Sequence, residues 1–141
     1  MDKFLSYKKF LEEQEKYTLK KNKFAVITGG CGRVGSVFIG QLLYSGYKVI
    51  CLSKTNKKYL DYKKTLPNNL EKKLFWHSLD LLNPKTVTSA VNFIFNKFST
   101  IDILINNAAD SNRGEFFKYS IDSLEKEFWG TFGSSFLLTE K

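Results

Sequence analysis

Arginine, cysteine and histidine are scarce in this chain of 141 residues, although Lys and Arg outnumber Asp and Glu by 22 to 14 and give a net charge of +8. Arg33 and Arg113 are the only arginines. Because arginine is the preferred base-reading side chain, and no finger spacing or aromatic-basic repeat occurs, we do not expect a nucleic-acid partner. Cys31 and Cys51 lack metal-ligand spacing and are too few for a disulfide framework. We therefore expect no metal site and a reducing, cytoplasmic location.

Long apolar runs are also missing. No run approaches the roughly 20 residues of a membrane-spanning helix, and the N-terminus lacks the apolar core of a secretory signal, so we expect no membrane association. Hydrophobic residues still make up 43% of the chain, which is enough for one domain with a core. We predict an amphipathic helical extension over residues 1–22 and a single domain over residues 23–141.

Strand-like and helix-like segments alternate along that domain. Apolar runs predict strands over 24–28, 47–52, 73–79 and 101–105, separated by a helix over 33–44 that ends at Gly46 and by a lysine-rich connection through Pro67. Asn83 and Pro84 mark the start of a further helix, and Ser120 caps a last one. The helix that begins at Pro84 has a predicted core-facing stripe, made of Val87, Ala90, Val91, Ile94, Phe95 and Phe98. The alternation predicts an α/β fold of the Rossmann type, a doubly wound parallel sheet.

The segment "TGGCGRVG", from Thr28 to Gly35, joins the first strand to the first helix. Gly30, Gly32 and Gly35 give the spacing G-x-G-x-x-G in the context that this motif requires. Free backbone N–H groups at a helix N-terminus, with the helix dipole behind them, suit a diphosphate. A tight turn without a ligand is the alternative interpretation.

Together with "HSLDLLN" (77–83) and "IDILINNAA" (101–109), this turn resembles the short-chain dehydrogenase/reductase family from residue 23 to the C-terminus. In that family the glycine turn holds the dinucleotide phosphates, an aspartate after the third strand meets the adenine, and the segment after the fourth strand lines the cofactor. The cofactor-binding residues implied are Gly29, Gly30, Gly32, Arg33, Val34, Gly35, Ser53, Lys54, Asp80, Leu81, Asn107 and Ala108. Helix capping by Asp80 and a strand-end turn at Asn106 and Asn107 are the structural alternatives.

The residues at the end of the predicted second strand bear on the choice between NAD and NADP. An NAD site places a carboxylate there, about twenty residues past the glycines, to bind the ribose 2′-hydroxyl. This chain has Ser53 and Lys54 instead, and a cation there together with Arg33 favours the 2′-phosphate of NADP. NAD is the alternative, since Lys54 also fits a solvated cluster of lysines that extends to Lys73.

The family's catalytic residues, a Ser and a Tyr-x-x-x-Lys pair, follow a fifth strand that this chain does not reach. Three Tyr-x-x-x-Lys matches are interpreted as coincidence in a lysine-rich chain: Tyr17/Lys21, Tyr44/Lys48 and Tyr59/Lys63. Thr131 falls near the position of the family's active-site asparagine, and His77 lies in a predicted strand as a structural residue. We therefore expect no catalytic residue here, a truncated Rossmann domain that is incomplete at its C-terminus, and no activity from these residues alone.

The resemblance implies an NAD(P)-dependent oxidoreductase that transfers hydride between nicotinamide and a carbonyl or hydroxyl substrate, a small molecule that the sequence does not identify. The spacing Thr28, Gly29, Gly32, Gly35 leaves open an epimerase or dehydratase acting on nucleotide-linked sugars. A non-catalytic nucleotide-binding fragment is the other alternative. For a full-length form we expect a homo-oligomer.

Overall fold

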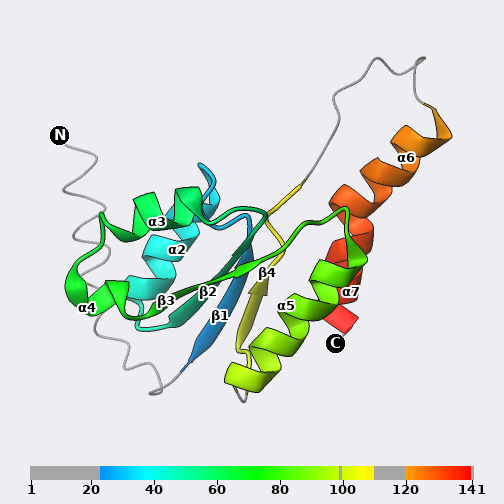
Figure 1. The fold of residues 1–141 in the computed structure, drawn as a ribbon. Helices are drawn as coiled ribbons and strands as arrows, with labels where there is room; N and C mark the ends of the chain where they lie inside the picture. The colour runs from blue at the N-terminus through cyan, green and yellow to red at the C-terminus, as the bar shows by residue number, and fades with distance from the viewer. Residues whose placement is uncertain (1–22, 99, 110–119, 141) are drawn as a thin grey trace.

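A four-stranded parallel sheet forms the centre of the computed structural model, which describes residues 23–98, 100–109 and 120–140 (Figure 1). The predicted extension over residues 1–22 lies outside them. The strands are β1 (Phe24–Thr28), β2 (Lys48–Ser53), β3 (Leu74–Ser78) and β4 (Ile103–Ile105), in the order β3-β2-β1-β4. Every pairing is parallel, with Ile27 opposite Cys51 in one ladder and Ile105 in the other. The predicted strands and the predicted parallel sheet are confirmed, with ends that differ by one or two residues.

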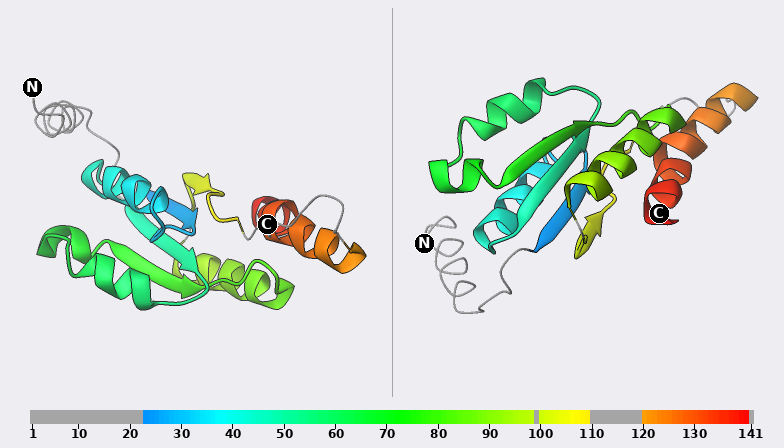
Figure 2. Two further views of the ribbon diagram at one scale, coloured as in Figure 1. Left: turned by 90° about the horizontal axis from the view of Figure 1, so that it is seen from above. Right: turned by 60° about the horizontal axis from the view of Figure 1, so that its bottom comes forward.

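Helices cover both faces of this sheet (Figure 2). On one face lie α2 (Gly35–Tyr44), α3 (Lys57–Lys63) and α4 (Asn68–Glu71), and on the other α5 (Pro84–Lys97) and α7 (Ser134–Glu140). The helix α6 (Ile121–Phe128) extends beyond the sheet and leads through the π-helical turn η2 (Trp129–Gly133) into α7. The sequence predicted a plain connection where α3 and α4 stand. Tyr59 and Leu70 explain the difference, because both are buried against the sheet and anchor these two short helices to it.

The interior of the sheet is apolar on both faces, as expected for parallel strands covered by helices. Along β2, Val49 and Cys51 face the α2 side of the sheet, whereas Ile50 and Leu52 face the α5 side, and all four are fully buried. This two-sided burial holds the carboxyl ends of the strands in fixed positions. Those ends carry the residues of the candidate site.

Helix α5 begins as predicted, with Asn83 Oδ1 accepting a hydrogen bond from the Lys85 N–H at 3.1 Å. Its core-facing stripe is confirmed except at Phe95. That ring is 54% exposed, whereas Ile94 beside it is buried. Consecutive helical residues are rotated by about 100°, which carries Phe95 past the edge of the buried face.

The segment from α6 to α7 presents an exposed apolar row. Its members are Ile121, Leu124, Phe128, Phe132 and Phe136, which are between 49% and 83% exposed. Ser120 caps α6 as predicted, its Oγ accepting from the Ser123 N–H at 3.2 Å. In the described ranges no helix combines the length and the apolar character that crossing a membrane would require.

Candidate dinucleotide-binding site

The candidate site lies at the carboxyl edge of the sheet, where β1 and β4 end side by side. The chain winds from β1 to β2 and β3 in one direction, and β4 then pairs with the opposite edge of β1. In open α/β sheets this reversal of strand order opens a crevice between the strand ends, and ligands bind there. Gly29 follows β1 directly and lies against Ala108, which follows β4.

Three glycines of the turn are required by close packing. Gly29 has a φ of +63°, and a Cβ there would come within 3.0 Å of Ala108 Cβ. A Cβ at Gly30 would lie 2.7 Å from Ile39 Cδ1, and one at Gly35 would lie 2.5 Å from the Gly29 carbonyl oxygen. Gly32 is different, because its Cβ would approach only the Gly29 oxygen, at 3.2 Å. Gly29, Gly30 and Gly35 therefore let the turn fold tightly onto the sheet, and Gly32 leaves the outer side of the turn accessible.

The turn presents unpaired donors at the N-terminus of α2. The Gly32 N–H donates to the Gly29 carbonyl and the Ser36 N–H to the Gly32 carbonyl, both at 2.9 Å. The N–H groups of Arg33, Val34 and Gly35 have no acceptor within residues 23–98, 100–109 and 120–140. No side chain caps α2 and its first turn holds no acidic residue. Unpaired N–H groups and the positive end of a helix dipole together suit an anion.

A set of hydrogen bonds clasps the end of β1 to the segment after β4. Thr28 Oγ1 accepts from the N–H of Asn107 at 3.0 Å and from that of Ala108 at 2.9 Å. Asn107 Nδ2 donates to the carbonyl oxygens of Thr28 at 2.9 Å and Gly29 at 3.2 Å. Asn107 therefore holds the base of the glycine turn, whereas Asn106 makes one exposed contact, to Thr139 Oγ1 at 3.2 Å.

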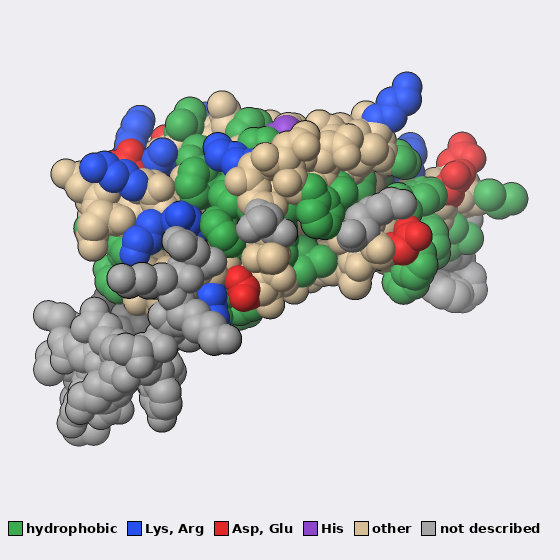
Figure 3. All heavy atoms as spheres, turned by 90° about the horizontal axis from the view of Figure 1, so that it is seen from below, with side chains coloured by type: hydrophobic (Ala, Val, Ile, Leu, Met, Phe, Trp, Pro, Cys, Tyr) green, Lys and Arg blue, Asp and Glu red, His purple; other side chains and the backbone are tan. Residues whose placement is uncertain are grey.

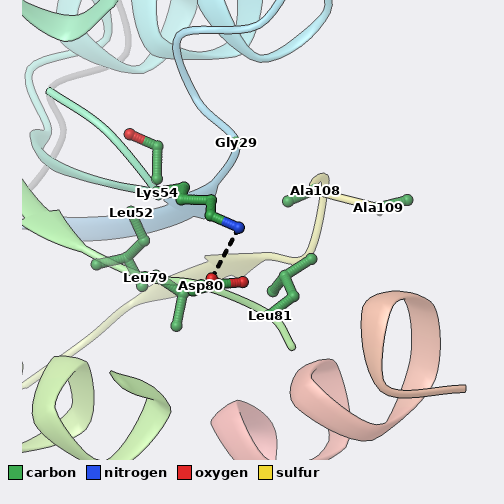
Figure 4. Close-up of a pocket in the computed structure, with 9 residues that line it drawn as sticks. Gly29, Leu52, Lys54, Leu79, Asp80, Leu81, Ala108 and Ala109 are labelled. Carbon is green, nitrogen blue, oxygen red and sulfur yellow. Dashed lines mark ion pairs between the residues drawn. The ribbon is translucent and has the colours of Figure 1, made fainter. Parts of the chain in front are cut away.

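An open pocket of about 180 Å³ adjoins the turn (Figure 4). It is lined by Gly29, Leu52, Ser53, Lys54, Leu79, Asp80, Leu81, Ala108 and Ala109. These residues lie at the carboxyl ends of all four strands or directly after them, so the pocket extends from the glycine turn across β2 to β3. Six of the residues predicted to bind cofactor are brought together here, namely Gly29, Ser53, Lys54, Asp80, Leu81 and Ala108.

An ion pair crosses this pocket. Lys54 Nζ lies 2.8 Å from Asp80 Oδ2, and the side chains are 66% and 26% exposed, respectively (Figure 4). The hydrogen bond from Lys54 holds the pKa of the Asp80 carboxyl below its ordinary value, with a smaller contribution from the N–H of Leu82. Asp80 therefore stays ionised near neutral pH and offers an acceptor to a ligand on the β3 side of the pocket.

Ser53 makes two contacts of its own. Its hydroxyl donates to the Thr55 carbonyl at 3.0 Å and accepts from Trp76 Nε1 at 2.9 Å. These bonds fix the side chain at the end of β2, beside the pocket. A carboxylate is absent from that strand end, as the sequence indicated.

Other residues that the sequence singled out lie apart from the pocket. Arg33 is exposed on the turn and does not line it. The Tyr59 hydroxyl donates to the Leu74 carbonyl at 3.2 Å, at the amino edge of the sheet, and Lys48 also starts its strand there. The pairs Tyr44/Lys48 and Tyr59/Lys63 are therefore anchored away from the strand ends that form the site. The pair Tyr17/Lys21 lies outside the described residues.

Thr131 and His77 both have structural contacts. Thr131 is exposed on η2 and its hydroxyl donates to the Glu127 carbonyl at 2.6 Å. The ring of His77 stacks on Phe93, with centroids 4.4 Å apart, and its Nε2 lies 3.2 Å from Ser89 Oγ. Burial lowers the pKa of His77. These contacts agree with the structural role predicted for His77.

Sequence patterns missed two features of the site. Ser134 is buried and donates from its hydroxyl to the carbonyl of Leu81, so α7 is tied to a residue that lines the pocket. The sulfurs of Cys31 and Cys51 lie 3.4 Å apart under the glycine turn. Neither feature has a local signal, because the partners are 53 and 20 residues apart in the sequence.

The positive charge does not gather at one place in the view from below. Lys and Arg side chains form several separate groups there, with apolar and neutral polar groups between them (Figure 3). Within the described part of the chain, no group of three or more His, Cys, Asp and Glu residues is arranged to hold a metal ion.

Comparison with known proteins supplies relatives for this fold and site. (+)-Neomenthol dehydrogenase from Capsicum annuum is 36% identical over 92 residues, which cover 63% of this chain and 29% of that protein. The structure of L-sorbose reductase from Gluconobacter frateurii, complexed with NADPH and L-sorbose, matches with a TM-score of 0.74 at 18% identity, over 85% of this chain and 46% of its own. A short chain dehydrogenase from Leptospira borgpetersenii with bound NAD+ matches with a TM-score of 0.69 at 24% identity, over 85% and 44%.

The chain thus spans less than a third of the length of this curated relative and about half the length of these two structures. A family model described as short chain dehydrogenase matches residues 23–141, which include the glycine turn, the pocket and the segment after β4. The resemblance noted in the sequence is confirmed: this chain belongs to the short-chain dehydrogenase family.

Proposed function

We propose that residues 23–141 form the dinucleotide-binding part of an NAD(P)-dependent oxidoreductase. The observation that carries this proposal is the glycine turn, which opens α2 with unpaired N–H groups beside the crevice between β1 and β4. In this proposal Gly32 and the N–H groups of Arg33, Val34 and Gly35 hold the cofactor diphosphate. Asp80 and Leu81 bind the adenine, and Ala108 lines the crevice towards the nicotinamide.

The cofactor supplies the hydride chemistry, and the residues of this chain bind and orient it. The clasp of Thr28 and Asn107 fixes the turn against β4, so that the donors are in position before the ligand arrives. A donor that is already oriented costs little reorganisation on binding. The substrate is proposed to be a carbonyl or hydroxyl compound.

An epimerase or dehydratase of nucleotide-linked sugars is not favoured. The relative and the structures that resemble this chain are a dehydrogenase, a reductase and a short chain dehydrogenase. A non-catalytic nucleotide-binding protein remains the second candidate. It shares with the oxidoreductase the cradle for the diphosphate, which is the glycine turn from Gly29 to Gly35, and differs from it only in lacking turnover.

The cradle is tested best at Gly32, because Gly35 is the wrong place to add a side chain. A Cβ at Gly35 would lie 2.5 Å from the Gly29 oxygen, so a substitution there would distort the turn whether or not it binds phosphate. At Gly32 the nearest atom is 3.2 Å away, and Gly32→Ala serves as a steric control. We expect Gly32→Asp to weaken dinucleotide binding by at least about tenfold relative to Gly32→Ala, since its carboxylate repels the diphosphate by about as much as one charge-assisted hydrogen bond contributes.

Titration calorimetry of the full chain with NADPH and NADH measures this difference. Circular dichroism should show that both Gly32 variants remain folded. Equal affinities in the two variants would remove the diphosphate from the turn and leave it as a structural connection.

We further propose a preference for NADP over NAD. It is supported by Lys54 at the pocket and by Ser53, a neutral residue, at the strand end where an NAD site places a carboxylate. A charge-assisted hydrogen bond to the 2′-phosphate contributes about 1.5–3 kcal/mol, and the exposure of Lys54 favours the lower end, which is about a tenfold preference.

Lys54→Gln should remove that preference and leave the affinity for NADH nearly unchanged. Lys57→Gln is the matched control, because Lys57 is also exposed but does not line the pocket. If both variants weaken NADPH binding equally, the effect comes from overall charge and Lys54 has no specific contact.

A further inference from the structure

The two cysteines of the chain meet beneath the glycine turn. Cys31 lies within the turn, between Gly30 and Gly32, and Cys51 lies on β2 with no exposed surface. Their sulfurs are 3.4 Å apart. Gly30 makes room for this contact, because a Cβ there would come within 3.0 Å of Cys51 Sγ.

A disulfide is within reach from this arrangement. The S–S bond measures about 2.05 Å, so the sulfurs must approach by about 1.4 Å. Cys51 is held in the ladder opposite Ile27, whereas Cys31 stands on a turn outside any helix or strand. Rotation of the Cys31 side chain, with a small shift of the turn, would bring the two atoms together.

The two thiols differ in exposure and in the direction of their pKa shifts. The hydrogen bond from the Cys51 thiol holds the pKa of Cys31 below its ordinary value, whereas the same contact and burial raise the pKa of Cys51. Cys31 is only partly buried, so a small oxidant in solvent can meet it first. A cysteine that is accessible, has a lowered pKa and adjoins a second thiol is in the arrangement that oxidises reversibly.

We propose that Cys31 and Cys51 form an oxidisable dithiol site in the floor of the cradle, with a peroxide as its oxidant. The Cys31 sulfur attacks one peroxide oxygen, the O–O bond breaks, and Cys31 becomes a sulfenic acid as one water leaves. The Cys51 sulfur then attacks the Cys31 sulfur, the S–O bond breaks, and the hydroxyl leaves as a second water with the Cys51 proton. Two thiols lose two electrons and two protons, and hydrogen peroxide is reduced to two waters.

The disulfide ties the turn to β2. Because the donors of Arg33, Val34 and Gly35 lie two to four residues after Cys31 in the same turn, pulling Cys31 inward moves them away from their open positions. Oxidation should therefore lower the affinity for dinucleotide, and bound dinucleotide should slow oxidation. This consequence rests on the proposed function, whereas the disulfide itself does not.

The test treats the full chain with hydrogen peroxide, then alkylates the remaining thiols and measures the intact mass without reductant. We expect the monomer to lose the mass of two hydrogen atoms, to lose both alkylation sites, and to regain them after reduction with dithiothreitol. Disulfide-linked dimers as the main product, or a sulfinic acid on Cys31 with Cys51 still free, would overturn the proposal.

Two serine variants test the order of attack. Cys51→Ser should leave Cys31 to accumulate as a sulfenic acid that a 1,3-dione reagent traps, whereas in Cys31→Ser the buried Cys51 should stay unmodified in the folded chain. If Cys51 reacts as fast as Cys31 in these variants, Cys31 is not the first site of attack and the proposed order is wrong.

The link to the cofactor is measured separately, as the dinucleotide affinity of the oxidised and reduced chains. Weaker binding by the oxidised chain supports the proposed coupling. Equal binding by both would remove the coupling and leave the dithiol site intact. A disulfide in a chain that binds no dinucleotide in either state would contradict the proposed function alone.

Discussion

The clasp between β1 and β4 can be tested with one nearly isosteric substitution, Thr28→Val. The side chain of Thr28 is 1% exposed, and its hydroxyl accepts two backbone hydrogen bonds, from Asn107 and Ala108. Valine replaces the hydroxyl by a methyl group of similar size. The substitution therefore removes the acceptor while the surrounding packing stays in place.

The expected cost follows from the donors that are left behind. A buried donor without a partner costs about 1–3 kcal/mol. The Asn107 N–H also donates to the Ile105 carbonyl at 3.1 Å and keeps that partner, so the expected loss is that of one donor, the Ala108 N–H, about 2 kcal/mol. A loss of this size lowers the folding equilibrium constant by roughly 30-fold, since a tenfold change corresponds to about 1.4 kcal/mol.

Two controls separate the hydrogen bonds from other effects. Thr28→Ser keeps the hydroxyl and removes one buried methyl group, at a cost of about 0.8 kcal/mol. Asn106→Ala removes an exposed contact to Thr139 and should change stability by less than about 0.5 kcal/mol. Urea unfolding of the full chain, followed by the fluorescence of Trp76 and Trp129, gives all three values. If Thr28→Val is no less stable than Thr28→Ser, the clasp does not stabilise the sheet.

Two further predictions concern charge. Asp80→Asn removes the carboxylate that pairs with Lys54, so that Lys54 no longer has to leave Asp80 to contact the 2′-phosphate. The ratio of NADPH to NADH affinity, measured by calorimetry, should rise by up to about fivefold, which corresponds to the free energy of one exposed ion pair. An unchanged ratio would mean that Asp80 does not compete for Lys54. Burial lowers the pKa of His77 in the folded chain below its ordinary value of 6.5. As the pH falls, the unfolded chain therefore protonates His77 before the folded chain does, and the free energy of unfolding should decrease below about pH 6.5. His77→Gln keeps a partner for Ser89 and should remove this part of the pH dependence in urea unfolding between about pH 7 and 5, whereas an unaltered profile would assign it to other groups.

Much of the fold follows from local patterns along the chain. The apolar run at Val49 to Leu52 predicts a buried strand, because a strand that is covered on both faces carries apolar side chains at consecutive positions. Asn83 and Pro84 predict the start of α5, since a capping oxygen and a fixed φ act within one turn of helix. Helices α3 and α4 were missed because their lysine-rich segment has weak periodicity, and burial of Tyr59 and Leu70 stabilises them.

For the site, the sequence determined the residue types and their order, and the tertiary structure decided which of them meet. Spacing alone placed the glycines before a helix and Asp80 after a strand, because backbone geometry requires those types within a few residues. The Lys54–Asp80 ion pair, the clasp of Thr28 by Asn107 and the contact of Cys31 with Cys51 join residues 26, 79 and 20 positions apart. They exist because the strand order β3-β2-β1-β4 brings distant strand ends to one edge, and no local pattern encodes that order.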